Sequence, residues 1–466
     1  MNETTNGANC SPEQGAIDTT WKPKILAFCC NWCTYAGADL AGLNRMEYPA
    51  DIRLLRVPCS GRVNPQYVLK AYQDGCDGVL VCGCHPGDCH YATGNYYAKR
   101  RMMVYKRLLE FLGLEPDRFI VRWISGSEAG KFRDTVMEVT ERIRELGPLS
   151  NDLPNLVPED IPHPISAKYE WLATPPQKRK GGTVMNFTDI VRKRATQLIE
   201  DGTVACVIGW TAGRFEYQRT PFCANDSEQA ALLVCDQHCE HALGKYVLEQ
   251  KDKGRVGLIT RGCESRAINR LIADNQLKRE DVYLIGIPCT GCTTREGAEL
   301  KRCYECQFRN PVVYDELVGE LAPEPKNDRF ADVRNLEAMT REERRAFFDL
   351  MYETCIRCHA CRQACPCCTC KVCFAEQERE GWQGKQFDVE QARYYGVTRS
   401  FHVADRCIEC GECERVCPMG LPLMTLMHKQ IKDINELFGP YEGGGLSLDA
   451  PDALRTFKTD DIEEFM

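Results

Sequence analysis

Short apolar runs alternate with longer amphipathic segments through the first 146 residues of the chain. Runs such as KILAFCC (24–30) and DGVLVCGC (77–84) predict buried strands, and YYAKRRMMVYKRLLEFLG (96–113) predicts a helix that ends at glycine. The full prediction is strands at 24–30, 52–61, 77–84 and 119–125 and helices at 34–46, 64–75, 96–113 and 128–146. This alternation favours a flavodoxin-like α/β domain over residues 21–146, with helices on both faces of a parallel sheet.

A second α/β pattern covers residues 183–325. The prediction is helices at 188–202 and 227–250, the latter capped by Ser227, strands at 203–210 and 281–292, and a strand–turn–helix unit at 254–277. Proline-rich residues 147–182 separate the two patterns and predict an extended, semi-rigid linker. The N-terminal domain is therefore expected to fold when it is expressed alone.

A third region, residues 340–440, begins and ends with a helical pattern. Thr340 followed by Glu343 predicts a capping box that opens the helix before Cys355. Residues 421–438 predict an amphipathic helix. The remaining segments are a polar insert at 374–406, a disordered polar tail at 1–20, and an acidic, glycine-rich tail at 441–466 that is expected to dock a partner.

The cysteine content changes this picture more than any other feature of the composition. The 466 residues include 30 cysteines, although MNETTNGANCSPEQG at the start has neither the basic nor the apolar segment of a signal peptide. No apolar run reaches the length of a membrane helix, and a net charge of −8 without a long basic tract disfavours a nucleic-acid partner. We therefore expect a metal-binding protein in the cytoplasm of an anaerobic, reducing cell.

The motif C-x-x-C-x-x-C-x-x-x-C-P occurs twice, as CIRCHACRQACP (355–366) and CIECGECERVCP (407–418). This spacing is typical of two-cluster ferredoxins, in which the fourth cysteine of each run ligates the 4Fe-4S cluster of the other run. Zinc sites instead use two C-x-x-C pairs. The predicted ligands are Cys355, Cys358, Cys361 and Cys417 for one cluster, and Cys407, Cys410, Cys413 and Cys365 for the other.

Four further cysteines follow the first run, namely Cys367, Cys368, Cys370 and Cys373. Two interpretations stay open: these side chains pack around a cluster, or Cys368, Cys370 and Cys373 help to ligate a cluster shared with the middle region. Positive charge near an anionic cluster raises its reduction potential. The arginines associated with the two runs are Arg357, Arg362, Arg406 and Arg415.

Cysteines also follow three predicted strands of the N-terminal region. Because the carboxyl ends of parallel strands meet at one edge of the sheet, these thiols are expected to form a cluster site there. The candidates are Cys30, Cys33, Cys59, Cys84 and Cys89. They are one more than a single cluster uses, and the sequence does not identify the spare one. We interpret Cys29, Cys76 and Cys82 as small core residues.

The middle region contains two C-x-x-C pairs, Cys289 with Cys292 and Cys303 with Cys306. Two such pairs are the minimum pattern of a metal site. Their separation is shorter than in a zinc ribbon, and Cys263 in RGCESR is a further thiol at a predicted strand end. We therefore favour an iron–sulfur cluster over zinc in this region.

The N-terminal motifs resemble a known family. CNWCTYAGADLAG, RVPCSGRVNP, GVLVCGCHPGDCHYATGNYYAKRR and WISGSEAGKF are similar to the iron–sulfur delta subunit of methyl-viologen-reducing hydrogenase, over about residues 24–146. The resemblance implies a 2Fe-2S cluster instead of a four-iron one. It also implies electron transfer to a heterodisulfide-reductase-like FAD subunit.

A second resemblance covers the middle and ferredoxin-type regions. RGCESRAI, GIPC and CYECQFRNPVVYDELVGE, with CIRCHACRQACP downstream, are similar to the beta-subunit family of deazaflavin-coenzyme-dependent hydrogenases and formate dehydrogenases. The resemblance implies a 4Fe-4S cluster and FAD. No G-x-G-x-x-G fingerprint supports a flavin site independently, so FAD stays open.

These observations predict a multi-cluster electron-transfer subunit without chemistry of its own. It would relay electrons between a hydrogenase, formate dehydrogenase or similar oxidoreductase and a heterodisulfide-reductase-like flavoprotein of the electron-bifurcating type. The alternative is an FAD-dependent reductase that acts on a deazaflavin or nicotinamide coenzyme in the middle region. A thiol–disulfide reductase is disfavoured, because the adjacent pairs Cys29-Cys30 and Cys367-Cys368 lack the glycine of the heterodisulfide-reductase cluster motif.

Overall fold

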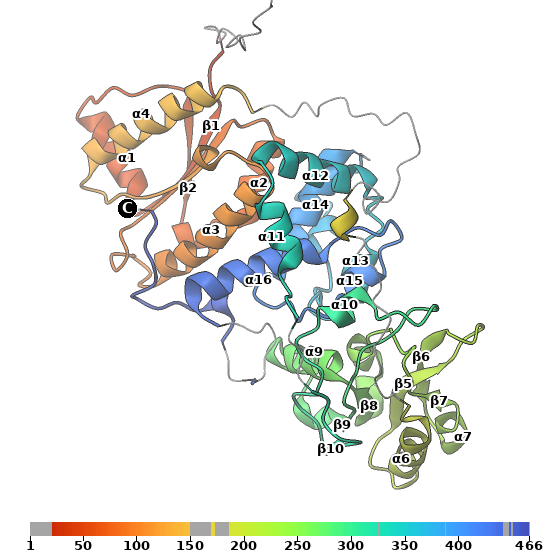
Figure 1. Cartoon of the computed structure of the whole chain (residues 1–466). Coiled ribbons are helices and arrows are strands. Elements are labelled where there is room, and N and C mark those ends of the chain that lie inside the picture. Colours follow the sequence, from red (N-terminus) through yellow and green to blue (C-terminus); the bar gives the residue numbers. More distant parts are fainter. Residues whose placement is uncertain are drawn as a thin grey trace, which may run out of the picture.

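The computed structural model describes residues 21–149, 169–172, 186–323, 327–386, 388–440, 447–448 and 451–465. The predicted tail at 1–20 and most of the predicted linker lie outside these residues. Figure 1 shows an N-terminal α/β part and a helical part, coloured cyan to blue, that lies beside it. A second α/β part, coloured green, lies at the far end of the molecule.

Every strand and helix predicted for the N-terminal region is present. The strands are β1 (Ile25–Cys30), β2 (Ile52–Val57), β3 (Gly78–Gly83) and β4 (Phe119–Trp123), and the helices are α1 (Thr34–Leu43), α2 (Pro65–Gln73), α3 (Gly94–Phe111) and α4 (Ala129–Leu146). All four strands pair in parallel, in the order β2-β1-β3-β4. The chain changes direction across the sheet between β1 and β3, and open α/β sheets bind ligands at such a switch point. The flavodoxin-like class itself stays a prediction.

The N-terminal sheet is buried on both faces, which explains why its strands are continuous apolar runs. Helices α1 and α4 cover one face, where Phe132 packs in the same cluster as Leu80. Helices α2 and α3 cover the other face, where Met102 packs in the same cluster as Val81. Neighbouring residues of β3 therefore pack into two separate hydrophobic cores, one on each face of the sheet.

The middle region forms a mixed sheet with helices around it. Its strands are β5 (Cys206–Ala212), β6 (Arg219–Ala224), β7 (Leu233–Val234), β8 (Val256–Thr260), β9 (Val282–Gly286) and β10 (Glu316–Leu317), and its helices are α6 (Thr188–Glu200), α7 (Ser227–Ala230), α8 (Val247–Gln250), α9 (Gly262–Ala273) and α10 (Lys301–Tyr304). Strands β10-β9-β8-β5 run parallel, whereas β6 and β7 pair antiparallel with β5. Helix α7 is capped by Asp226, whose carboxylate accepts the backbone N–H of Gln229, and not by the predicted Ser227.

The prediction of one long helix at 227–250 is wrong. Helix α7 is a single turn, β7 pairs with β5, and α8 is another single turn. The Asp236 carboxylate accepts the backbone N–H of His238 at 2.9 Å, and this local turn competes with helical hydrogen bonds. Strand β9 also stops at Gly286, before the cysteines that are predicted to end it.

The C-terminal region is helical. Its helices are α11 (Ala331–Glu337), α12 (Arg341–Thr354), α13 (Ala360–Ala364), α14 (Val389–His402), α15 (Glu412–Arg415) and α16 (Met424–Phe438). The predicted capping box is confirmed, because Thr340 and Glu343 each accept the backbone N–H of the other through their side chains. The predicted polar insert is only partly polar, since α14 buries Tyr394, Val397 and Phe401.

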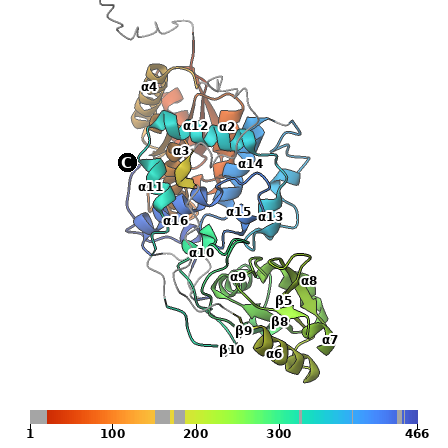
Figure 2. The same cartoon turned by 45° about the vertical axis from the view of Figure 1, so that its right-hand side comes forward.

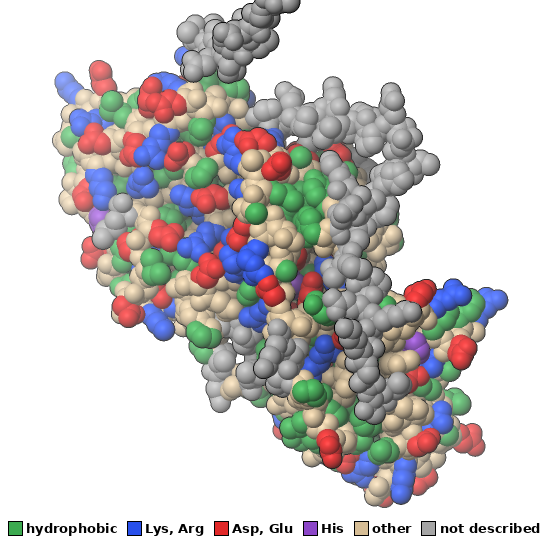
Figure 3. Space-filling model, in the orientation of Figure 1, with side chains coloured by type: hydrophobic (Ala, Val, Ile, Leu, Met, Phe, Trp, Pro, Cys, Tyr) green, Lys and Arg blue, Asp and Glu red, His purple; other side chains and the backbone are tan. Residues whose placement is uncertain are grey.

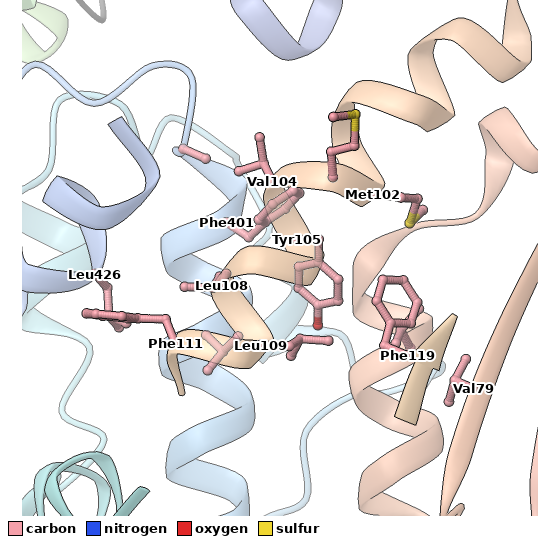
Figure 4. Packing of buried hydrophobic residues seen from close by; sticks show 14 of the residues in the cluster. Val79, Met102, Val104, Tyr105, Leu108, Leu109, Phe111, Phe119, Phe401 and Leu426 are labelled. Carbon is pink, nitrogen blue, oxygen red and sulfur yellow. The ribbon is translucent and has the colours of Figure 1, made fainter. Parts of the chain in front are cut away.

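The N-terminal sheet domain and the C-terminal helices share one hydrophobic core, part of which is seen in Figure 4. Helix α3 lies between them. The ring of Tyr105 packs on Phe401 of α14 with centroids 5.0 Å apart, and that of Phe111 packs on Phe348 of α12 at 5.3 Å. Residues 21–146 by themselves would expose the outer face of α3 to water, and the independent folding of this domain stays a prediction.

The last described residues of the chain lie against the N-terminal domain. Arg100 on α3 is 3% exposed and donates two hydrogen bonds to the Asp461 carboxylate, at 2.5 and 2.7 Å. The indole N–H of Trp123, in β4, donates to Glu463 at 2.9 Å. The described end of the predicted 441–466 tail therefore makes contacts within the chain, and its docking to a partner stays a prediction.

The middle domain projects from the rest of the molecule, with α9 and α10 on the side that faces the C-terminal helices (Figure 2). On the face seen in Figure 3, acidic and basic side chains are interspersed over the surface. Within the described ranges, no helix is both long enough and apolar enough to cross a membrane.

Candidate iron–sulfur centres

Four buried thiols meet at the carboxyl edge of the N-terminal sheet. Cys30 ends β1 and Cys84 follows β3, and their sulfur atoms lie 3.8 Å apart. Cys59, after β2, and Cys89, in the loop before α3, have sulfur atoms 3.7 Å apart. The fifth candidate, Cys33, is half-buried and stands at the N-cap of α1. Cys30 also lies within thiol–thiol hydrogen-bonding reach of Cys59, and Cys33 of Cys84, so the five thiols form one group that contains two close pairs.

The spacing of these pairs fits a metal cluster. Two thiolates on one tetrahedral metal with bonds of about 2.3 Å lie roughly 3.7–3.8 Å apart, so each pair matches one metal ion. The site also requires a small neighbour, because a Cβ atom added to Gly94 would lie 2.5 Å from the Cys59 sulfur. In the part of the chain that the structure describes, no group of three or more His, Cys, Asp or Glu side chains is arranged around a single ion. Four buried thiols in two pairs suit the soft metals of iron–sulfur chemistry.

The N-terminal thiols polarise one another. Hydrogen bonds from the thiols of Cys59 and Cys84 lower the pKa of Cys30 well below its ordinary value. The same bonds, together with burial, raise the pKa of both donors. Burial raises the pKa of Cys33 as well. These hydrogen bonds favour the thiolate of Cys30, the form of cysteine that binds metals.

The two ferredoxin-type runs share an unusual backbone conformation. Arg357 and His359 in the first run have φ angles of 48° and 62°, and Glu409 and Gly411 at the matching positions of the second run have 53° and 65°. Three of these four residues are not glycine, so the left-handed conformation costs roughly 1–2 kcal/mol at each of them. Strain repeated at matching positions indicates that both loops are shaped for the same function, and we infer ligand binding.

The first predicted ligand set lines a single cavity of the C-terminal region. The cysteines of this set are Cys355, Cys358, Cys361 and Cys417. The sulfur of Cys361 lies 3.6 Å from the hydroxyl oxygen of Tyr395, on whose ring His359 stacks at 4.5 Å. A hydroxyl that donates to a ligand sulfur raises the reduction potential of the cluster that the sulfur binds.

The second predicted set is gathered in a small apolar cluster. Its members are Cys365, Cys407, Cys410 and Cys413. Met424 of α16 contacts the Cys413 sulfur with its own sulfur at 3.8 Å, so this methionine borders the site. Burial raises the pKa of Cys407, Cys410 and Cys413. The structure therefore places each run's fourth cysteine near the other run's first three, and their role as cluster ligands stays a prediction.

The further cysteines after the first run have different surroundings. Hydrogen bonds from the thiols of Cys367 and Cys368 lower the pKa of Cys365. The carbonyl oxygen of Cys368 accepts from Lys245 of the middle domain at 3.2 Å. Cys373 packs beside a cluster of aromatic side chains, whereas Cys370 is exposed. Whether any of these cysteines is a cluster ligand stays a prediction.

The middle-domain candidates converge beside the first turn of α9. The backbone N–H of Cys292 donates to the Cys303 sulfur at 3.3 Å. Cys263 and Cys306 line one small cavity, and Cys289 is close enough to Cys292 for a thiol–thiol hydrogen bond. The five cysteines from which the sequence predicts one site are therefore close together in the structure.

Arg261 is a functional candidate that the sequence analysis missed. Its guanidinium is 2% exposed and donates to the Cys292 sulfur at 3.0 Å. It also pairs with Glu264 at 2.7 Å. The charge of Arg261 favours the thiolate of Cys292, but a hydrogen bond with Cys289 and burial outweigh it and raise the pKa of Cys292 to about 11.

Two buried cysteines of the middle domain also escaped prediction. Cys235 and Cys239 lie in the segment that we interpreted as a helix. The carbonyl oxygen of Cys239 accepts from both Arg261 and the Cys292 thiol. The C-x-x-x-C spacing in CDQHC was the available signal, and the helix interpretation concealed it.

His428 and Asp332 form a buried ion pair near the middle-domain site, with Nδ1 and Oδ2 3.0 Å apart. Burial alone would lower the pKa of His428, but the hydrogen bond and charge of Asp332 outweigh it and raise this pKa from 6.5 to about 9. Because the raised pKa belongs to the folded state, the stabilisation is complete below pH 6.5 and is lost as the pH rises through about 9. A shift of this size corresponds to roughly 3 kcal/mol.

We therefore expect the thermal midpoint of the cluster-replete protein to fall between pH 6.5 and 9, and His428→Gln to flatten this dependence. Anaerobic scanning calorimetry at several pH values measures both. Parallel curves for the two proteins would show that this ion pair does not control the pH dependence.

Known proteins resemble two parts of the chain. Residues 25–147 match the family model described as methyl-viologen-reducing hydrogenase, delta subunit, and residues 367–422 match that of a 4Fe-4S dicluster domain. The vhc iron-sulfur subunit of the F420-non-reducing hydrogenase of Methanococcus voltae is 52% identical over 128 residues, which are 28% of this chain and 89% of that protein. The corresponding iron-sulfur subunit of Archaeoglobus profundus is also 52% identical over 128 residues, 93% of its length.

A larger protein contains a similar domain. It is a subunit of the ferredoxin:CoB-CoM heterodisulfide reductase of Methanosarcina mazei, 47% identical over 131 residues, which are 28% of this chain and 16% of that protein. Together with the thiol pairs and the dicluster match, these relatives define the class: the chain is an iron–sulfur electron-transfer subunit. Through residues 25–147 it belongs to the family of methyl-viologen-reducing hydrogenase delta subunits.

Proposed function

We propose that this chain relays electrons through four iron–sulfur centres. They are a 2Fe-2S centre in the N-terminal domain, two 4Fe-4S clusters in the C-terminal region, and one more cluster in the middle domain. When bound, the clusters supply one-electron chemistry, and the protein sets their spacing, burial and potential. The observation that supports a relay is that neighbouring cysteine sets contact the same side chain or approach each other across the same cleft.

Arg302 connects the middle set with the second ferredoxin-type set. Its guanidinium donates to the carbonyl oxygen of Cys410 at 3.2 Å and to Glu412 at 2.7 Å. Its charge is also felt by the thiols of Cys303 and Cys263. One half-buried arginine thus contacts or influences both sites, so the two centres are close neighbours across the interface between the domains.

The N-terminal site approaches the C-terminal region across a cleft. Cys59 lines this cleft together with Phe401 and His402, at the end of α14. Cys407, the first cysteine of the second run, follows a few residues later. This arrangement supports a chain of centres that starts at the N-terminal edge, passes through the ferredoxin-type clusters and reaches the middle domain.

The geometry also supports a ligand assignment for the N-terminal centre. Cys30 and Cys84 would hold one iron, and Cys59 and Cys89 the other, because each pair has the spacing expected on one tetrahedral metal. Cys33 is then the spare thiol. Four of the five middle-domain candidates would hold the fourth cluster.

The proposed partner of the N-terminal centre is a heterodisulfide-reductase-like FAD protein. Trp32 and Tyr91 are 46% and 53% exposed beside this site, and the Trp32 ring stacks on His90 at 3.7 Å. Exposed tryptophan and tyrosine are the side chains most often found at the centre of protein interfaces. A hydrogenase or formate dehydrogenase would supply the electrons, in a cytoplasmic complex of the electron-bifurcating type.

Anaerobic purification of the full chain with its native partners tests this function. We expect well over ten irons per chain, counting about four per cube and two for the N-terminal centre, and a co-purifying FAD protein whose association is lost in Trp32→Ala/Tyr91→Ala. Leu43→Ala, on a separate exposed apolar side chain, is the matched control. Stoichiometric zinc with iron for only two cubes would contradict the N-terminal and middle-domain centres.

An activity measurement separates the relay from the FAD-dependent reductase. The isolated, cluster-replete chain is assayed with nicotinamide and deazaflavin coenzymes, and a relay protein should show little turnover alone. Turnover above roughly one per second, with FAD bound to the middle domain, would instead favour the reductase.

A further inference from the structure

Arg399, on helix α14, lies among the cysteines of both ferredoxin-type sets. The side chain is 6% exposed, and the sulfur atoms that act on its charge include those of Cys361, Cys365 and Cys413. Cys361 belongs to the first predicted set, whereas Cys365 and Cys413 belong to the second. Arg399 also lines the cavity of the first set. One guanidinium therefore lines the first site and is close enough to the second for its charge to act on those thiols.

The protein offers this buried charge little compensation. One Nη atom of Arg399 donates to the carbonyl oxygen of Cys361 at 3.2 Å, and its Nε is buried without a hydrogen-bond partner. Among the described residues, no carboxylate forms an ion pair with Arg399. Arg393 on the same helix, by contrast, pairs with Asp349 and Glu390. A permanently charged group without a counter-ion is costly in the interior, so an anionic group in the two cysteine sites would stabilise it.

Three of the arginines associated with the cysteine runs differ from Arg399. Arg362, Arg406 and Arg415 each pair with a nearby carboxylate. A paired arginine presents a largely neutralised charge to a cluster, because the field of the carboxylate opposes that of the guanidinium. Arg399 has no such opposing charge among the described residues and is the stronger influence on the two sites.

We propose that Arg399 is the shared counter-ion of both 4Fe-4S clusters and raises their reduction potentials together. This proposal rests on the cluster assignment of the proposed function. Reduction adds one negative charge to a cluster, and a fixed positive charge at short range in a low dielectric stabilises the reduced state. Because the charge of the same guanidinium acts on both sets, one substitution changes both centres. Arg399 is a positioning and tuning residue; no cluster is ligated by it.

The test is an EPR-monitored redox titration of the full, cluster-replete chain with Arg399→Gln. Both four-iron midpoint potentials should fall, each by at least the 59 mV that corresponds to a tenfold weaker one-electron reduction. The potential of the N-terminal centre should stay unchanged and serves as an internal reference. Arg399→Lys keeps the charge and should restore most of both potentials. Arg133→Gln removes an exposed arginine from α4 and controls for net charge.

Each result of this titration decides the proposal. A fall confined to one cluster, or to neither, would overturn the shared role, and so would an equal fall in Arg133→Gln. If Arg399→Gln does not assemble its clusters, the Arg399→Lys variant decides the question. Wild-type cluster loading and potentials in this variant support the proposal. A fall of both four-iron potentials that corresponds to a tenfold or larger weakening of reduction overturns it. Wild-type protein with no four-iron signals would overturn the proposed function itself, a result that is distinguishable by iron content before any titration.

Discussion

Cys59→Ala is expected to abolish the two-iron signal of the N-terminal domain, whereas Cys33→Ala should leave it intact. The Cys59 sulfur lies 3.7 Å from that of Cys89, the separation expected for two ligands of one iron. Cys33 is half-buried and belongs to neither close pair. EPR spectra and iron content of the anaerobically prepared full chain measure the effect, and the expected loss is about two irons per chain.

Cys76→Ala is the matched control for the loss of a thiol, because Cys76 is also half-buried but lies outside the strand-end group. It should keep the signal. If Cys33→Ala loses the two-iron signal and Cys89→Ala retains it, our assignment is contradicted. Cys33 would then be the ligand and Cys89 the spare thiol.

Asp461→Ala is expected to destabilise the protein by roughly 3–5 kcal/mol, the usual cost of leaving one partner of a buried ion pair alone. The substitution removes both hydrogen bonds to the Arg100 guanidinium, which stays buried on α3. It also frees the segment that carries Glu463 and its bond to Trp123. The midpoint of anaerobic thermal unfolding should therefore fall by several degrees relative to wild type.

Asp460→Ala provides the control, since Asp460 is the exposed neighbour of Asp461. It removes the same charge from the same segment but should change the midpoint little. Similar unfolding of the two variants would mean that the C-terminal segment contributes no specific stability through Arg100.

The N-terminal sheet could be predicted from sequence because its signals are local. Its strands are buried on both faces and are therefore continuous apolar runs, and the helices between them end at recognisable positions such as Gly75 and Gly113. The capping box at Thr340 is equally local, since both partners lie within one helical turn. Predictions of this kind depend on neighbours in the chain, and the structure agrees with them.

The failures depend on partners that are distant in sequence. Strand β7 is extended because it pairs with β5, an interaction that the composition of residues 227–250 does not reveal. Helix α14 lies in a segment of polar appearance and is held by contacts such as that of Phe401 with Tyr105 of the N-terminal domain. Tertiary contacts of this kind override local propensity.

Cysteine spacing in the sequence identified the candidate sites, whereas the distances and contacts that set their chemistry are seen only in the structure. The motif alone predicted which cysteines belong to each ferredoxin-type set. It gave no reason to distinguish Cys33 from Cys59, because that distinction rests on sulfur–sulfur distances. It also gave no reason to select Arg261 and Arg399, whose burial among cysteines is set by distant segments.

The shared core has a consequence for how the chain is made. The N-terminal domain leaves the ribosome before the segments that cover the outer face of α3, which are α12, α14, α16 and the residues around Asp461. At about 5–20 residues per second, that apolar face stays uncovered for tens of seconds. Nascent and prematurely terminated chains would therefore present a binding surface to chaperones and proteases, and only a full-length product would hide it.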